Sequence, residues 1–203
     1  MDDPLIFLSK DNILKPLIKK YSLKQLEKSA HLFTDLVEAI LSQQLSSKAA
    51  ATITSRFLAL FPDKSLNAEK ILLMGEDSLR SVGISRQKIS YLKNLSENIS
   101  LGILEISHLE ELSDDEVIIE LTKVKGIGRW TAEMFLIFSL NRPDIFSVGD
   151  LGLRSAVSRL YQIDREDKIA IEKLSRQWTP YRSYASRLLW RSLDNEPKVV
   201  TSA

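Results

Sequence analysis

Apolar residues recur along most of the chain at intervals of three and four positions, the spacing of one face of an α-helix. Between residues 33 and 43 this spacing places Phe33, Leu36, Val37, Ile40 and Leu41 on one stripe. No alternating run is long enough to predict a sheet, so we expect an all-α chain. The same reasoning predicts further helices over residues 12–21, 46–61, 67–74, 85–95, 113–121, 129–140, 150–161, 167–178 and 181–193.

Polar residues mark where several of these helices begin and end. Ser46 or Ser47 can cap the third helix, which we expect Pro62 to end. The sequence from Ser113 to Glu116 is a capping box, in which each side chain satisfies the other's backbone N–H. We expect Gly75 to end a short helix, and the tail after Asn195 to fray.

Composition narrows the class of protein. With 203 residues, of which 44% are hydrophobic, the chain can bury the core of one domain or of two closely packed ones. Its 7 Gly and 6 Pro are too few for a β-sandwich or a disordered chain. Lys and Arg number 28 against 27 Asp and Glu, a net charge of +1, so any affinity for nucleic acid must come from local positive charge.

The absence of cysteine excludes disulfides and zinc or iron–sulfur centres held by cysteine. His31 and His108 form no ligand cluster, so we expect no catalytic metal. The apolar run near the N-terminus is too short for a signal peptide, and no stretch approaches the ~20 apolar residues of a membrane span. We expect a monomer without membrane association, located in a prokaryotic cytoplasm at the nucleoid or in a eukaryotic nucleus.

Two glycines, Gly126 and Gly128, lie between a helix that ends and a helix that begins. Glycine tolerates positive φ and lets another backbone come close. The free N–H groups of such a hairpin, together with the next helix N-terminus, can bind a phosphate. Lys123, Lys125 and Arg129 add positive charge beside it. The alternative is a helix–helix turn whose glycines serve only tight packing.

The segment from Leu121 to Ala132, followed by a helix and then Asp150 at 24 positions after Gly126, resembles the helix-hairpin-helix DNA repair glycosylases. It is most similar to the 3-methyladenine DNA glycosylase II branch, and the resemblance extends from about Phe33 to Trp190. It implies an all-α, bilobal fold within residues 1–203, without an N-terminal β-domain. One lobe would span about 33–140, with the hairpin at 121–132. The other would combine the N-terminal helix with 150–193, and the active site would lie in the cleft between them.

Asp150 has two interpretations that are compatible with each other. An aspartate at the start of a helix is an ordinary N-cap. The resemblance implies that Asp150 is also the catalytic carboxylate. Cleavage of an N-glycosidic bond builds positive charge on the deoxyribose, which a nearby anion stabilises. The same carboxylate can position or activate a water molecule.

Three residues are expected to line the base pocket by the same resemblance. Trp130 occupies the position where bifunctional relatives have the lysine that forms a Schiff base, so we expect base removal without strand cleavage. A purine alkylated at N3 or N7 is cationic and stacks well on an indole, for which Trp130 and Trp190 are candidates. Met134 lies where relatives often have an aromatic residue, which leaves the substrate range open. The alternative for Trp130 is an ordinary core tryptophan.

Further segments are expected to contact DNA. The loop around Gln44, Leu45 and Ser46 resembles the loop that inserts a wedge side chain into the gap left by a flipped nucleotide. Alignment without gaps makes Gln44 the wedge residue, whereas the apolar side chain of Leu45 is chemically better suited to fill the gap. Ile84, Ser85 and Lys88 resemble a second segment that probes the minor groove, where Lys88 could reach a phosphate. A polar loop and a solvated helix start are the respective alternatives.

Carbonyl oxygens of the hairpin hold a monovalent cation in this family, and the matching residues are Thr122, Val124 and Ile127. We therefore expect a structural Na⁺ or K⁺ but no catalytic cofactor. The function implied is a monofunctional DNA N-glycosylase of base excision repair, acting on 3-methyladenine, 7-methylguanine and, as a further candidate, ethenoadenine in damaged double-stranded DNA. The rivals are a glycosylase for mismatched or oxidised bases and a helix-hairpin-helix DNA-binding or damage-sensing module without catalysis.

Overall fold

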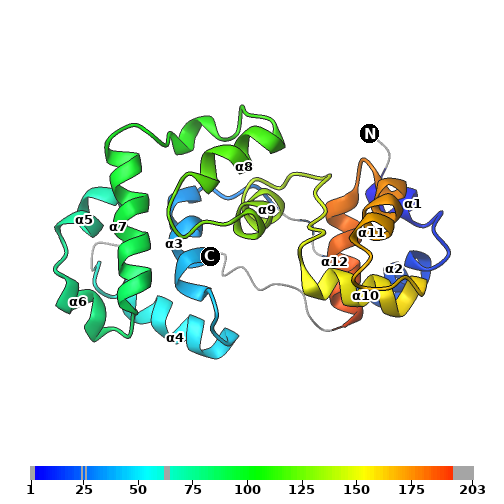
Figure 1. Ribbon diagram of the computed structural model, residues 1–203, viewed down its shortest axis with the longest axis horizontal. Coiled ribbons are helices and arrows are strands. Elements are labelled where there is room, and N and C mark those ends of the chain that lie inside the picture. Colours follow the sequence, from blue (N-terminus) through cyan, green and yellow to red (C-terminus); the bar gives the residue numbers. More distant parts are fainter. Residues whose placement is uncertain (1–2, 24, 26, 62–64, 194–203) are drawn as a thin grey trace. The chain divides into compact units, whose positions relative to one another are not determined.

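The computed structural model describes residues 3–23, 25, 27–61 and 65–193. Every regular element among these residues is a helix and none is a strand, which confirms the all-α prediction (Figure 1). No helix in the described part of the chain is long and apolar enough to cross a membrane. The helices are α1 (Pro4–Leu8), α2 (Leu14–Lys20), α3 (Leu32–Ser42), α4 (Ser47–Leu58), α5 (Ala68–Leu73), α6 (Glu76–Ser81), α7 (Arg86–Ser100), η1 (Ile106–His108), α8 (Asp114–Thr122), α9 (Arg129–Phe138), α10 (Leu151–Tyr161), α11 (Lys168–Ser175), η2 (Arg176–Trp178) and α12 (Arg182–Ser192).

The helices expected from apolar spacing are present, with ends that differ by a few residues. Ser46 caps α4, and Ser113 with Glu116 forms the capping box of α8. Helices α1 and α6 were not predicted, because helices of five and six residues are too short to show the 3.6-residue period. Gly75 was wrongly expected only to end a helix, since it is the N-cap residue of α6. The expectations for Pro62 and for the tail after Asn195 fall outside the described residues.

The chain divides into two compact units, and α9 runs from one into the other. Unit 2 contains the described residues from Ser29 to Phe135. Its central element is α7, which packs against α3, α5 and α6 (Figure 1). Leu92 and Leu95 of α7 are fully buried, so this helix forms much of the core of the unit.

Helix α3 buries two carboxylates on one face. Asp35 and Glu38 are each 3% exposed, and neither carboxylate oxygen of Glu38 has a hydrogen-bond partner. Burial, with a smaller contribution from the negative charge of Asp35, raises the pKa of Glu38 to about 7. The helix that precedes the predicted wedge therefore contains a carboxyl group that titrates near neutral pH.

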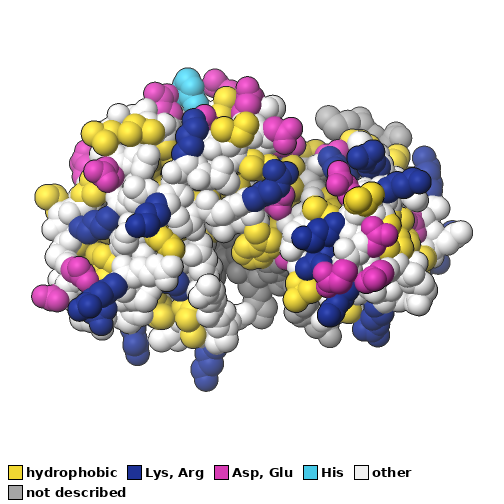
Figure 2. Space-filling model, in the orientation of Figure 1, with side chains coloured by type: hydrophobic (Ala, Val, Ile, Leu, Met, Phe, Trp, Pro, Cys, Tyr) yellow, Lys and Arg dark blue, Asp and Glu magenta, His cyan; other side chains and the backbone are white. Residues whose placement is uncertain are grey.

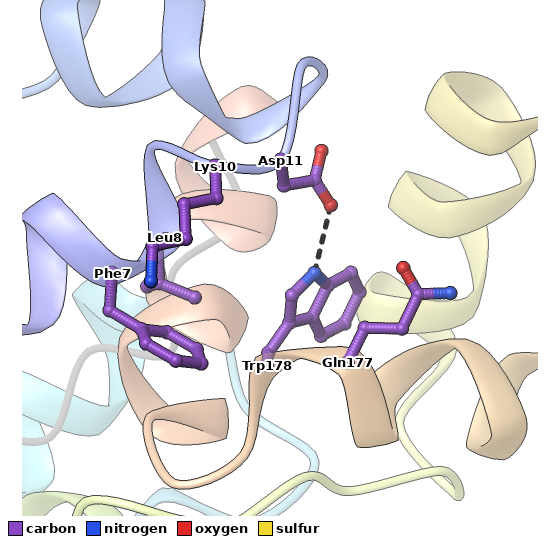
Figure 3. Close-up of a pocket in the computed structure, with 6 residues that line it drawn as sticks. All are labelled: Phe7, Leu8, Lys10, Asp11, Gln177 and Trp178. Atoms are coloured by element: carbon purple, nitrogen blue, oxygen red, sulfur yellow. Dashed lines mark hydrogen bonds between the residues drawn. The ribbon is translucent and has the colours of Figure 1, made fainter.

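Unit 1 joins the described residues up to Lys28 with those from Leu136 to Leu193. Helix α12 contacts α1, α2 and α10. Asp11 bonds the N-terminal segment to the C-terminal part of unit 1. Its Oδ2 accepts hydrogen bonds from the hydroxyl of Tyr161 at 2.8 Å and from the indole N–H of Trp178 at 3.0 Å. Asp11 and Trp178 are among the residues that line a cavity of about 160 Å³, and Figure 3 shows the hydrogen bond between them. The N-terminal segment is thus bonded to residues about 150 positions later in the chain.

Candidate active site and DNA-binding residues

Asp150 is the N-cap residue of α10, as the sequence predicts. Its Oδ1 accepts a hydrogen bond from the backbone N–H of Leu153 at 2.7 Å, while its own backbone is extended, with φ −73° and ψ 121°. The side chain is half-buried. The carboxylate is therefore fixed in orientation by the first turn of the helix that it caps.

Trp190 makes the second contact with this carboxylate. Its indole Nε1–H donates to Asp150 Oδ1 at 2.9 Å. The indole is only 1% exposed, and the ring of Phe138 stacks on it with centroids 6.0 Å apart and an interplanar angle of 27°. Trp190 is thus a buried side chain whose polar edge faces Asp150.

Gly152 allows this close arrangement. A Cβ atom at this position would lie 3.1 Å from Asp150 Oδ1 and 3.3 Å from Trp190 Cδ1, closer than ordinary van der Waals contact. Gly152 lies in the first turn of α10 and does not have a positive φ. Glycine is therefore needed for its lack of a side chain and not for its conformational freedom.

The loop that carries Asp150 is bonded to the start of α12. Arg182 donates from Nε to Asp144 Oδ1 at 2.8 Å and from Nη2 to Asp144 Oδ2 at 3.0 Å. The hydroxyl of Ser183 donates to the carbonyl of Arg142 at 2.6 Å and accepts from the backbone N–H of Ile145 at 2.9 Å. The segment leading to Asp150 is therefore held at several points along its length.

Trp130 and Met134 lie one turn apart on α9, in unit 2. Trp130 is 44% exposed, and Met134 is 5% exposed. A partly exposed indole is unusual for a core tryptophan, so the position of Trp130 is compatible with the base-pocket interpretation. The pocket roles of Trp130, Met134 and Trp190 stay predictions.

The two hairpin glycines have different surroundings. Gly126 has φ +96°, and a Cβ there would lie 2.2 Å from Cγ of Tyr91, so both backbone conformation and space require glycine. Nothing lies within 4 Å of a Cβ built on Gly128. The first glycine therefore serves packing, whereas the second leaves open space directly before α9.

The basic side chains of the hairpin also differ from one another. Lys123 pairs with Glu120 at 2.7 Å, and Arg129 pairs with Glu133 at 2.9 Å. The exposed Lys125 forms no ion pair with any residue that the structure describes. Figure 2 shows basic and acidic side chains interspersed over the visible face, in keeping with the net charge of +1. The predicted affinity of the hairpin for a phosphate therefore depends on local positive charge, for which the exposed Lys125 is a candidate.

Gln43–Ser46, here called the wedge loop, joins α3 to α4. Gln44 is exposed and has φ +56°, a left-handed conformation that is uncommon for a residue other than glycine. Leu45 is 37% exposed, and the hydroxyl of Ser46 accepts from the backbone N–H of Ala49 at 3.3 Å. Gln44 and Leu45 therefore both project from a short loop whose backbone is constrained on either side.

The segment around Ser85 is less open than the sequence suggests. Ser85 caps α7, accepting from the backbone N–H of Lys88 at 3.3 Å. Ile84 as a whole is only 2% exposed, so its side chain is buried in unit 2. The ammonium of Lys88 donates to the backbone carbonyl of Leu41 at 2.5 Å instead of pointing into solvent.

The family model for HhH-GPD superfamily base excision DNA repair proteins matches residues 37–181. The chain belongs to this superfamily. The matched range includes the wedge loop, the hairpin and Asp150, but it ends before Trp190. Among the residues that the structure describes, no group of three or more His, Cys, Asp or Glu could hold a metal ion.

Individual members of the superfamily are also similar to the chain. The putative DNA-3-methyladenine glycosylase YfjP of Bacillus subtilis is 33% identical over 186 residues, which cover 88% of this chain and 62% of the relative. The chain thus spans less than two thirds of that relative's length. The crystal structure of a DNA-3-methyladenine glycosidase from Bacillus halodurans matches with a TM-score of 0.83 and 35% identity, over 94% of this chain and 89% of the other. The Schizosaccharomyces pombe 3-methyladenine DNA glycosylase Mag1, solved in complex with abasic DNA, matches with a TM-score of 0.79 and 35% identity, over 94% of this chain and 96% of the other.

Sequence reasoning did not identify several residues that shape these sites. Gln43, Phe138 and Gly152 each contact a predicted site residue or its backbone. Gln43 directly precedes the predicted wedge residues, and this position was the one feature of the sequence that could have indicated its role. The others could not be found, because their importance arises from contacts between segments far apart in the chain.

Proposed function

We propose that the chain is a monofunctional DNA N-glycosylase of base excision repair, which removes alkylated purines from duplex DNA with Asp150 as its catalytic carboxylate. The observation that carries the proposal is the fixed Asp150–Trp190 pair at the start of α10. The relatives named as 3-methyladenine DNA glycosylases support the substrate class. The abasic DNA bound to one of them is what remains once such an enzyme has released a base.

The proposed mechanism uses the flipped nucleotide and the oriented carboxylate. Cleavage of the N-glycosidic bond leaves a deoxyribose with oxocarbenium character, and the charge of Asp150 stabilises it. The same carboxylate positions the water molecule that completes the hydrolysis. Because a purine alkylated at N3 or N7 is already cationic, it leaves readily and needs no strong protein acid. Trp130 occupies the position of the lyase lysine, so no Schiff base forms and the strand stays intact.

The proposal includes a structural Na⁺ or K⁺ on the carbonyl oxygens of Thr122, Val124 and Ile127. Thr122 is the last residue of α8, where carbonyl groups lack helical partners, and the carbonyl of Val124 accepts from the N–H of Ile127 at 3.0 Å within the same turn. Carbonyl oxygens suit a hard cation, so the residues fit. The cation would link the hairpin to a phosphate. We also propose that the protein acts as a monomer. Its single domain would have the two lobes that the resemblance implies.

The first prediction concerns Asp150→Asn. Asparagine is an equally good helix cap, so the variant should fold normally and bind DNA. It should release 3-methyladenine and 7-methylguanine from methylated duplex DNA at least about 100-fold more slowly than wild type, because the anion is lost. Base release is measured directly, and strand cleavage is followed with and without alkali. Wild type should cut DNA only after alkali.

Asp167→Asn is the matched control, since Asp167 caps α11 by accepting from the N–H of Ala170 at 2.9 Å. This variant should retain full activity. If Asp150→Asn is as active as Asp167→Asn, Asp150 is only a cap. If wild type binds DNA but releases no base above the spontaneous rate, the chain is a binding or damage-sensing module. Strand cleavage by wild type without alkali would contradict the monofunctional assignment.

A further inference from the structure

Two side-chain hydrogen bonds tie the wedge loop and the end of the helix before it to other parts of unit 2. The ammonium of Lys88 donates to the carbonyl of Leu41 at 2.5 Å, one residue before the end of α3. The side-chain amide of Gln43 donates to the carbonyl of Gly126 in the hairpin at 2.8 Å. Both bonds are partly buried and join residues 47 and 83 positions apart in sequence. They fix both the end of α3 and the first residue of the loop.

The Lys88 bond has the character of a helix C-cap. The last carbonyl groups of a helix have no helical partner and carry the negative end of the helix dipole, so an ammonium group is favourable there. Burial lowers the pKa of Lys88. Lys93, also on α7, caps the end of α5 in the same way, because its ammonium donates to the carbonyls of Ile71, Leu72 and Met74 at 2.6–2.7 Å. Lysines of α7 thus secure the ends of two neighbouring helices.

A third bond completes the connection between the segments predicted to contact DNA. Oδ1 of Asn94 on α7 accepts from the backbone N–H of Lys125 in the hairpin at 2.8 Å. Gln43 therefore links the wedge loop to the hairpin, Asn94 links the hairpin to α7, and Lys88 links α7 to the end of α3 just before the wedge loop. Between these bonds, Gln44 keeps its left-handed backbone and Leu45 stays exposed.

We propose that Lys88 and Gln43 are positioning residues for the wedge loop, and that Lys88 acts through Leu41 without contacting a DNA phosphate. This inference rests on the proposed function, in which Gln44 and Leu45 enter the DNA stack. A loop that is already ordered loses less conformational entropy when it inserts, so the extrahelical state of the nucleotide forms more readily. A phosphate contact, by contrast, would contribute to overall affinity and to its salt dependence.

The test compares Lys88→Met with Lys125→Met in the full chain. The DNA probe is a duplex that contains a tetrahydrofuran abasic-site analogue with 2-aminopurine as its neighbour, because 2-aminopurine fluorescence rises when the base unstacks. Lys125→Met should lower the slope of log affinity against log salt by about one and leave the fluorescence at saturating protein unchanged. Lys88→Met should leave the slope unchanged and reduce the saturating fluorescence increase by about half or more. Its single-turnover base release should fall about tenfold.

Gln43→Leu provides an independent variant in case Lys88→Met fails to fold, and it should reproduce the loss of fluorescence without a change in salt slope. Gln162→Leu is its control, because Gln162 also donates its amide to a backbone carbonyl, that of Arg159 at 3.0 Å, but within unit 1. Gln162→Leu should change neither measurement. A slope lowered by about one in Lys88→Met would identify a phosphate contact and overturn the proposal. Unchanged fluorescence in both Lys88→Met and Gln43→Leu would also overturn it.

Failure of the proposed function would be separately visible. The fluorescence reports unstacking and not bond cleavage, so a wild-type chain that unstacks the probe but releases no base contradicts the glycosylase assignment alone. A wild-type chain that binds the duplex without any fluorescence increase contradicts the wedge itself, and the positioning role with it.

Discussion

The carboxylate of Asp150 receives the N–H of Leu153 and the indole N–H of Trp190 through the same oxygen, Oδ1. Such a shared acceptor leaves the carboxyl group little freedom to rotate, since two donors from different helices fix it. Preorganisation of this kind matters for catalysis, because a charge held in place stabilises the transition state without reorganising first. The precise fit of the neighbouring residues should therefore affect the rate more than stability.

Gly152→Ala tests this expectation. The added methyl group would lie 3.1 Å from Asp150 Oδ1 and 3.3 Å from Trp190 Cδ1, so the pair must shift by a few tenths of an ångström. Alanine favours a helix by about 1 kcal/mol over glycine, which should offset the strain. We expect single-turnover base release to fall about tenfold, while the free energy of unfolding in urea changes by less than about 1 kcal/mol.

The control for this variant is Gly149→Ala, since nothing lies within 4 Å of a Cβ at Gly149. It should retain the wild-type rate. Full activity of Gly152→Ala would show that the Asp150–Trp190 geometry tolerates displacement, and equal losses in both variants would point to the loop as a whole.

At this scale the sequence correctly predicted that Asp150 caps α10, but it did not predict which side chains surround the carboxylate. Aspartate before an apolar helix is a local signal, and so is its distance from the hairpin. The contact with Trp190 joins residues 40 positions apart and depends on how α10 packs against α12. Nothing in the local sequence distinguishes Gly152 from a glycine that merely starts a helix.

At the level of elements, the hairpin between α8 and α9 contains two glycines that the sequence presents as equivalent. The structure separates them, because the ring of Tyr91 on α7 lies against Gly126 and not against Gly128. Local sequence does predict a turn here, since Gly-Ile-Gly cannot continue a helix readily. It cannot predict which glycine packs against α7, as that depends on a side chain about 35 residues away in the chain.

Alanine substitutions at Gly126 and Gly128 should therefore have different effects, the first on the free energy of unfolding and the second on DNA affinity. Gly126→Ala places a methyl group inside the space of Tyr91 at φ +96°, and we expect the free energy of unfolding to fall by more than about 2 kcal/mol. Gly128→Ala should cost less than about 1 kcal/mol but weaken binding to abasic duplex DNA about fivefold, because the methyl group occupies space through which a phosphate would approach. Urea denaturation and a DNA titration at fixed salt measure both. Unchanged DNA affinity in a folded Gly128→Ala would argue that the hairpin serves packing alone.

At the scale of the whole chain, unit 1 is discontinuous, a feature that the family resemblance led us to expect and that apolar spacing alone cannot predict. Its N-terminal segment precedes unit 2 in sequence, yet it packs with helices that follow residue 136. Apolar spacing predicted α2 and α12 as separate helices but carries no information about their pairing. Asp11 makes the link polar and specific, because Oδ1 accepts from the N–H groups of Ile13 and Leu14 while Oδ2 accepts from Tyr161 and Trp178.

This link should make part of the stability of unit 1 dependent on pH. Burial alone would raise the pKa of Asp11, but hydrogen bonds from Trp178, Tyr161 and the backbone outweigh burial and lower the pKa below the ordinary 3.8. A carboxyl group with a lowered pKa in the folded state stabilises that state at pH values above its unfolded pKa. The contribution is lost as the pH falls below about 4 and through the folded pKa.

Asp11→Asn should lower the free energy of unfolding by about 2 kcal/mol at neutral pH, because its NH₂ group must face either the indole N–H of Trp178 or two backbone N–H groups, so that buried donors lose their acceptor. The difference from wild type should shrink as the pH is lowered to about 3, where wild type loses the same charge.

Asp3→Asn is the control, since Asp3 caps α1 through exposed bonds to Leu5 and Ile6. This substitution should lower the free energy of unfolding by less than about 1 kcal/mol. Urea denaturation over this pH range measures both variants. A deficit in Asp11→Asn that stays constant down to about pH 3 would mean that the second acceptor oxygen of Asp11, and not its charge, holds the N-terminal segment to the rest of unit 1.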